Sequence, residues 1–178
     1  MASIAASLPW LLPGSIAALA VGTLASRALA RWLGVRWITA WVVLVSLGLI
    51  LAGTLSPLAT GGNAGPGVAR TCDLSRTWPA SFSDLAPGND VAVNLVMFFP
   101  LGCALGFAPL SRRTLLVLVG AIALPFAIEA LQLEVAALGR ACQGADVVDN
   151  LTGLAVGLTA GVVIAWLGSA VGRLIKPV

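Results

Sequence analysis

Polar side chains that can do chemistry are concentrated in one short stretch of the second half of the chain. Glu129 and Gln132 lie three residues apart in an apolar segment, and Asp146, Asp149 and Asn150 open the next apolar segment. Residues three or four apart share one face of a helix, so each set presents its polar groups together. A carboxylate is costly in lipid, so Glu129 should face protein or a water-filled cavity, which makes it a candidate functional residue.

Two further elements must help to position this set. Asp90 and Asn94, four residues apart, share a face of the preceding apolar segment, and Arg140 lies in the loop before Asp146. We expect one cluster that is open to the outside of the membrane, with Arg140 as a counter-charge. The candidate ligand-binding residues are Asn94, Glu129, Gln132, Arg140, Asp146, Asp149 and Asn150. The candidate catalytic residues are Glu129 and Asp149.

Simpler roles are open for some of these residues. Asp90 and Asp146 each stand at the start of an apolar segment, where an acidic side chain can act as a helix N-cap. Asn94 can serve only to tie helices together, as polar residues in membranes do. Neither role accounts for Glu129 with Gln132.

Composition predicts an all-α membrane protein. The 178 residues are 59% hydrophobic and only 10% charged, whereas soluble domains carry about 25% charged residues. The mean hydropathy is +1.01. We expect one membrane domain over residues 1–178 and no soluble domain. The chain has no histidine, which excludes His-based triads and His-ligated zinc. It has no phosphate-binding loop and no basic patch with aromatics, so no cofactor, metal or nucleic-acid partner is expected.

Five hydrophobic segments approach the roughly 20 residues that a membrane-spanning helix needs. The predicted spans are residues 8–30, 37–57, 91–110, 114–135 and 147–168. With five spans, seven of the ten basic residues gather on one side, and all seven acidic residues lie on or near the other. Because basic residues favour the cytoplasmic side, the N-terminus is predicted outside and the C-terminus inside a plasma membrane.

The connection over residues 58–89 is predicted to be an extracytoplasmic loop. It contains Cys72, and the next loop on the same side contains Cys142. Disulfides persist in oxidising compartments, so we predict a Cys72–Cys142 disulfide that ties the loop over the helix ends. Two free thiols are the alternative. Cys103 lies within a span and is expected to be a small packing residue.

Glycine repeats are expected to let helices approach closely. Gly153, Gly157 and Gly161 recur every fourth residue on one segment, and Gly102 and Gly106 do so on another. Small residues at this spacing allow close packing of membrane helices. The contact can form within one chain or between chains, so a homo-oligomer through these glycine faces is one expectation.

The motifs that carry these residues resemble the VanZ-like family, named for a membrane protein linked to resistance to the glycopeptide teicoplanin. The similar stretches are NLVMFFPLG from Asn94, IEALQ from Ile128, Arg140, and DVVDNLTG from Asp146, within about residues 90–161. The resemblance implies a small multi-pass bacterial membrane protein without a settled biochemical activity. The positions it matches are Asn94, Glu129, Gln132, Arg140, Asp149 and Asn150. Many relatives have a hydrophobic residue where this chain has Cys142, so the disulfide is predicted from this sequence alone.

Three functions fit these observations. In the first, the polar cluster binds the head of a membrane lipid, a lipid-linked cell-wall precursor or a glycopeptide, and affects glycopeptide resistance or envelope homeostasis. In the second, the protein is an intramembrane enzyme acting on a lipid-linked glycan or phosphate. Glu129 would then be the general acid or base, and Asp149 its charged partner or a co-ligand of a divalent cation. In the third, the protein is a structural membrane subunit.

Overall fold

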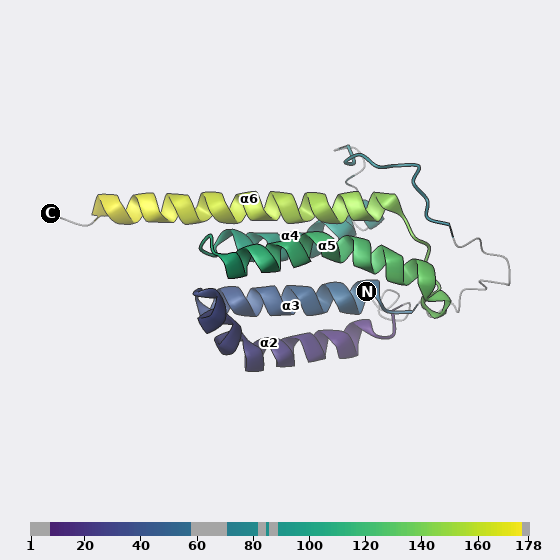
Figure 1. Cartoon of the computed structure of the whole chain (residues 1–178), viewed down its shortest axis with the longest axis horizontal. Helices are drawn as coiled ribbons and strands as arrows, with labels where there is room; N and C mark the ends of the chain where they lie inside the picture. The colour runs from purple at the N-terminus through teal and green to yellow at the C-terminus, as the bar shows by residue number, and fades with distance from the viewer. Residues whose placement is uncertain (1–7, 58–70, 82–84, 86–88, 176–178) are drawn as a thin grey trace.

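The computed structural model describes residues 8–57, 71–81, 85 and 89–175. The described helices are α2 (Leu11–Leu33), α3 (Trp37–Thr54), α4 (Asp90–Gly106), α5 (Arg112–Glu134), the 3-10 turn η2 (Ala136–Leu138) and α6 (Gly144–Ile175). The five long helices run side by side, and α6 extends beyond the others toward the C-terminus (Figure 1). We call one end of the bundle the polar end: α2, α4 and α6 begin there, and α3 and α5 end there.

Four helices are long and apolar enough to cross a membrane, namely α2, α3, α5 and α6. The fifth, α4, is apolar but has only 17 residues. At 1.5 Å per residue it is about 26 Å long, against a hydrocarbon core of roughly 30 Å. The all-helical, membrane-type architecture predicted from the sequence is therefore present.

The third predicted span, residues 91–110, is longer than the helix found there. The prediction placed the end near Leu110, but α4 ends at Gly106, and Phe107 and Ala108 close a turn with carbonyl groups three residues earlier. Pro109 explains this end, because proline disfavours the helical conformation of the residue before it. The predicted span 147–168 is instead too short, because α6 runs from Gly144 to Ile175.

A tight hairpin joins α2 to α3. Gly34 adopts a left-handed conformation with φ of 71°, and its N–H donates to the carbonyl of Ala30. Only glycine takes this conformation without strain, so it ends α2 and turns the chain. The two helices then approach closely where small residues meet, as at Gly14 against Ala52 and Gly48 against Ala18.

The glycine repeats pack α4 against α6 within the chain. A Cβ atom added to Gly157 would lie 2.1 Å from the carbonyl oxygen of Phe99, and one added to Gly102 would lie 2.1 Å from that of Leu154. Gly153, Gly161 and Gly106 meet the opposite backbone in the same way. These glycines therefore make their close contacts inside one molecule, and their spacing needs no second copy of the chain to explain it.

We therefore expect Gly157→Ala to destabilise the protein by about 1–3 kcal/mol, the usual cost of overpacking. The new methyl group would meet the backbone of α4 at Phe99 and Cys103, so the two helices would have to move apart there. Gly168→Ala is the matched control, because it lies on the same helix and a Cβ there meets nothing within 4 Å. Thermal unfolding in detergent should show a lower midpoint for the first variant only. Equal midpoints would contradict the packing described above.

The apolar core fills the middle of the bundle. It draws on α3, α4, α5 and α6 and includes Ile50, Phe98, Ile128 and Leu154, each no more than 3% exposed. Most other large apolar side chains face outward, which suits contact with lipid tails. The core holds the four helices in register, so the side chains one turn nearer the polar end are brought together.

Candidate functional site

Glu129 is buried at the polar end of α5, with 4% of its surface exposed. Its Oε2 accepts a hydrogen bond of 2.7 Å from the backbone N–H of Gln143, in the loop before α6. The expectation that Glu129 faces protein is confirmed. The partner is a backbone amide that the sequence analysis did not single out, and no pattern in the sequence marks it.

Gln132 and Arg140 bind the end of α3. The side-chain amide of Gln132 donates to the carbonyl of Thr54 at 3.0 Å. The guanidinium of Arg140 donates to the carbonyls of Ser56 and Gly53, at 3.1 and 2.8 Å. The last carbonyls of a helix lack partners within the helix, so these donors satisfy them and fasten α5 and its loop to α3.

Arg140 also has an electrostatic role, in addition to its hydrogen bonds to the carbonyls of Ser56 and Gly53. Burial lowers the pKa of its guanidinium, while the nearby carboxylates of Asp146, Glu129 and Asp90 raise it. A guanidinium stays charged despite such a shift because its ordinary pKa is far above neutrality. Arg140 therefore lies within electrostatic range of three carboxylates, as expected of a counter-charge.

Asp149 is paired with Arg76, a residue that the sequence analysis did not include in the site. Asp149 is 1% exposed, and its two carboxylate oxygens accept from the two terminal nitrogens of Arg76, one of them at 3.0 Å. Two-pronged pairing of this kind is the strongest arginine–carboxylate geometry. One signal was available: Arg76 is among only three basic residues predicted on the acidic side of the membrane.

A disulfide holds the segment that carries Arg76. Cys72 and Cys142 are bonded, with their Cα atoms 4.6 Å apart, as predicted. Beside the bond, the N–H of Asp73 donates to the carbonyl of Cys142, and the N–H of Gly144 donates to the carbonyl of Asp73. Residues 71–81 are thereby fixed against the start of α6. The rest of the predicted loop, residues 58–70, 82–84 and 86–88, lies outside the described residues.

Asn94 of α4 and Asp146 and Asn150 of α6 lie near the polar end of two helices that pack against each other. Asn94 lies close enough to Asp146 to hydrogen-bond its carboxylate, and both residues are half-buried. Asn150 follows Asp146 by one helical turn on the same face, and Leu154 of the core follows Asn150 by another. Asn150 is 1% exposed, and its Oδ1 atom has no hydrogen-bond partner in the part of the chain that the structure describes.

The N-cap explanation is wrong for both aspartates. Asn89 caps α4, since its side chain accepts from the N–H of Ala92 at 2.9 Å, and Asp90 is the first residue of that helix. Asp146 is the third residue of α6, which begins at Gly144. Both carboxylates therefore lie in the first turn of a helix, where the helix dipole favours negative charge.

The structure divides the seven candidate ligand-binding residues into two groups. Gln132, Arg140 and Asp149 form hydrogen bonds that hold the fold together. Asn94, Glu129, Asp146 and Asn150 make up the other group, which we call the open group. No set of three or more His, Cys, Asp or Glu side chains among the described residues is placed so that it could hold a metal ion.

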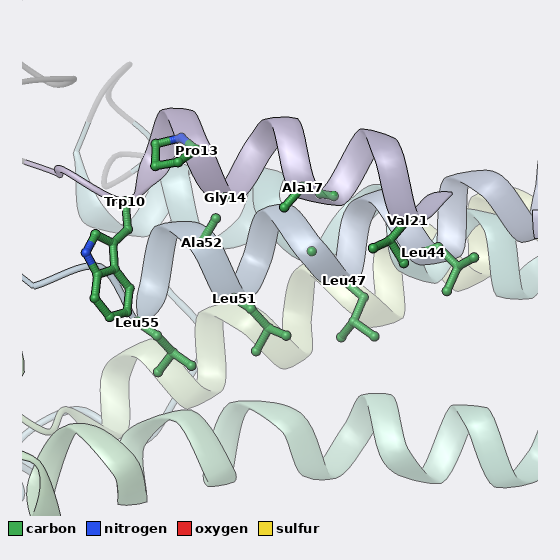
Figure 2. A pocket seen from close by; sticks show the side chains of 12 residues that line it. Trp10, Pro13, Gly14, Ala17, Val21, Leu44, Leu47, Leu51, Ala52 and Leu55 are labelled. Carbon is green, nitrogen blue, oxygen red and sulfur yellow. The ribbon is translucent and has the colours of Figure 1, made fainter. Parts of the chain in front are cut away.

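A separate apolar groove lies between α2 and α3, and none of the open-group residues lines it (Figure 2). It has a volume of about 720 Å³ and runs from Trp10 and Leu55 to Val21 and Leu44. Small residues such as Gly14 form its floor, and every lining side chain is apolar except for the indole of Trp10. The groove therefore offers contact area and no acid, base or nucleophile.

Comparison of the chain with protein-family models gives no match, and comparisons with curated proteins and with solved structures give none either.

Proposed function

We propose that this chain is a bacterial plasma-membrane protein of the VanZ-like kind. In this proposal its polar end binds the head of a membrane lipid, a lipid-linked cell-wall precursor or a glycopeptide. The observation that carries the proposal is the open group, whose buried polar side chains are not all used to hold the fold. Glu129 accepts a hydrogen bond from the backbone N–H of Gln143, and the Oδ1 atom of Asn150 has no partner among the described residues. Polar groups kept at such a depth in a membrane protein are costly and are typical of functional sites.

The proposed topology has five spans, with the N-terminus and the polar end outside. Support comes from the arginines at the opposite end of the bundle: Arg31 in the last turn of α2, Arg36 just before α3, and Arg112 and Arg113 in the first turn of α5. Basic residues near the ends of spans favour the cytoplasm. The short α4 counts as a span because it packs along α6 through the glycine contacts.

A tag placed at the C-terminus should accordingly be protected in intact cells, and a tag inserted between Gly61 and Gly67 should be accessible from outside. The positive-inside rule is the physical basis of this expectation. The insertion point lies outside the described residues. Accessibility to a membrane-impermeant reagent measures both positions. Labelling at the C-terminus of intact cells would exclude the five-span topology.

Glu129→Gln tests the proposed function. The variant keeps the shape of the side chain and an oxygen that can accept from Gln143, but it removes the charge. We expect expression of the original protein in a susceptible bacterium to raise teicoplanin resistance. The variant should reach the membrane and unfold at the same temperature as the original protein, yet lose this increase. The measurements are the inhibitory concentration and the thermal midpoint. Glu134→Gln is the control, because it removes an exposed carboxylate of the same helix.

Other results separate the alternatives. A lipid or glycan that changes mass only when the original protein is present would favour the enzyme. A silent Glu129→Gln, combined with poor expression of Glu129→Leu, would favour a structural subunit. In that case the carboxylate serves only to accept the hydrogen bond from Gln143.

A further inference from the structure

The open group, together with its neighbours Asp90 and Asp149, is rich in acceptors and in negative charge. Four carboxylates lie within electrostatic range of this cluster, those of Asp90, Glu129, Asp146 and Asp149. The guanidinium groups near them are those of Arg140 and Arg76. Among the described residues, four carboxylates therefore face two guanidinium groups, a formal excess of two negative charges. Both arginines already donate to carbonyl groups, and Arg76 also donates to Asp149. A ligand for this place should bring positive charge and hydrogen-bond donors.

Asn150 shows what the ligand has to supply. Its Oδ1 atom is buried and has no donor among the residues that the structure describes. A buried acceptor without a partner destabilises a protein. The residue lies on the face of α6 that also carries Asp146, so its side chain is on the inward side of the cluster. The missing group is therefore a donor within reach of the Asn150 and Asp146 side chains.

We propose that the open group binds a primary ammonium group, which donates to Asn150 and to the carboxylates of Asp146 and Glu129. This inference rests on the proposed function and names the chemical class of its ligand. An ammonium has three N–H donors and one positive charge, so it satisfies the unpaired acceptor and reduces the charge excess together. A water molecule would satisfy Asn150 but would leave the charge excess unchanged.

The residues of the cluster differ in exposure in an order that suits binding from the surface. Asp90 is exposed, and Asn94 and Asp146 are half-buried, whereas Asn150 and Glu129 lie deeper. Exposure thus falls stepwise from the surface to the unpaired oxygen. Primary ammonium groups of two origins fit this path: the head of an ethanolamine lipid, and an amino sugar of a glycan or glycopeptide.

The test uses the full-length protein in phosphatidylcholine nanodiscs and measures the thermal midpoint. Phosphatidylethanolamine should raise the midpoint over phosphatidylcholine, whose quaternary ammonium has the same charge and no N–H donor. If the source is an amino sugar, glucosamine should raise the thermal midpoint more than N-acetylglucosamine does. Binding to the folded state raises stability in proportion to the logarithm of ligand concentration over Kd. A rise with either amine supports the proposal, and the arm that responds identifies the source.

Asn150→Leu removes the acceptor while keeping a similar side-chain volume. Without amine, this variant should be at least as stable as the original protein, because it no longer buries an unpaired oxygen. Its affinity for the amine that binds should fall by roughly tenfold or more, the loss of one hydrogen bond to a charged donor. A residue with only a structural role would instead lower the stability without amine. If Asn150→Leu does not fold, Asp146→Asn serves instead, and Glu134→Gln is the control for both.

Failure of this inference can be told apart from failure of the proposed function. If phosphatidylglycerol or N-acetylglucosamine stabilises the protein as well as the amines do, and the effect depends on Asn150 or Glu129, the site binds a head group but the ammonium assignment is wrong. If no tested ligand shows an effect that depends on these residues, both proposals are overturned.

Discussion

Replacing Cys72 and Cys142 together by serine is expected to lower the stability of the protein by about 4 kcal/mol. The disulfide closes a loop of 70 residues, and the chain-entropy model gives this magnitude for a loop of that length. The effect should appear as a lower thermal midpoint in detergent without reductant. Cys103→Ala is the matched control, because Cys103 is the free cysteine of the described chain and lies within α4.

Alkylation of the cysteines provides a second test of the disulfide. In the native protein without reductant, an alkylating reagent should label Cys103 at most and leave the other two cysteines unmodified. After reduction, the segment 71–81 loses its covalent attachment, and Cys72 should become labelled. Free labelling of both Cys72 and Cys142 before reduction would show that the bond is absent in the native protein. In that case serine substitution should cost far less than the entropy model gives.

The fold could be predicted from the sequence because the physics of a membrane span leaves few choices. A run of about 20 apolar residues has to form a helix in lipid, where every backbone N–H and carbonyl needs a partner within the segment. The limits of the helices were harder to predict. Pro109 ended α4 early, and α6 continued past Gly168 because nothing in its sequence stops a helix there.

The depth of Glu129 and the disulfide also followed from the sequence. A carboxylate with no charged neighbour in an apolar segment has to be buried in protein, and two cysteines on the same oxidising side tend to pair. The roles within the cluster could not be predicted. Whether Gln132 and Arg140 face a ligand or the end of α3 depends on how three helices pack, and that packing is set by contacts far apart in the chain.

The role of Arg76 could not be predicted from the sequence either. It stands in a stretch rich in proline and polar residues, 73 positions before Asp149, and no periodicity relates the two residues. In the folded chain they are brought together by the disulfide and by the backbone pairing of Asp73 with Cys142 and Gly144 at the start of α6. The guanidinium of Arg76 is thus the second counter-charge of the cluster, after that of Arg140.

Replacing Arg76 by methionine should cost about 3–5 kcal/mol, because it leaves the Asp149 carboxylate buried without its counter-charge. Asp149→Asn should cost less, since the side chain of Arg76 is 23% exposed and can turn toward water, whereas Asp149 is 1% exposed and cannot. The two single variants therefore measure the two halves of the pair separately. Thermal or denaturant unfolding in detergent provides the measurement. Arg31→Met, at an exposed position near the end of α2, is the control for loss of a guanidinium.

The double variant Arg76→Met/Asp149→Asn decides between a specific pair and two independent effects. If the pair is specific, the second substitution removes the uncompensated charge that the first one created, so the double variant should be more stable than Arg76→Met alone. Residues in direct contact deviate from additivity by about 0.5–3 kcal/mol, and we expect a value in the upper part of that range for two hydrogen bonds to one carboxylate. Strict additivity would mean that the pair contributes no coupling energy. Arg76 would then act through its contact with the carbonyl of Trp78, and the segment would depend on the disulfide for its position.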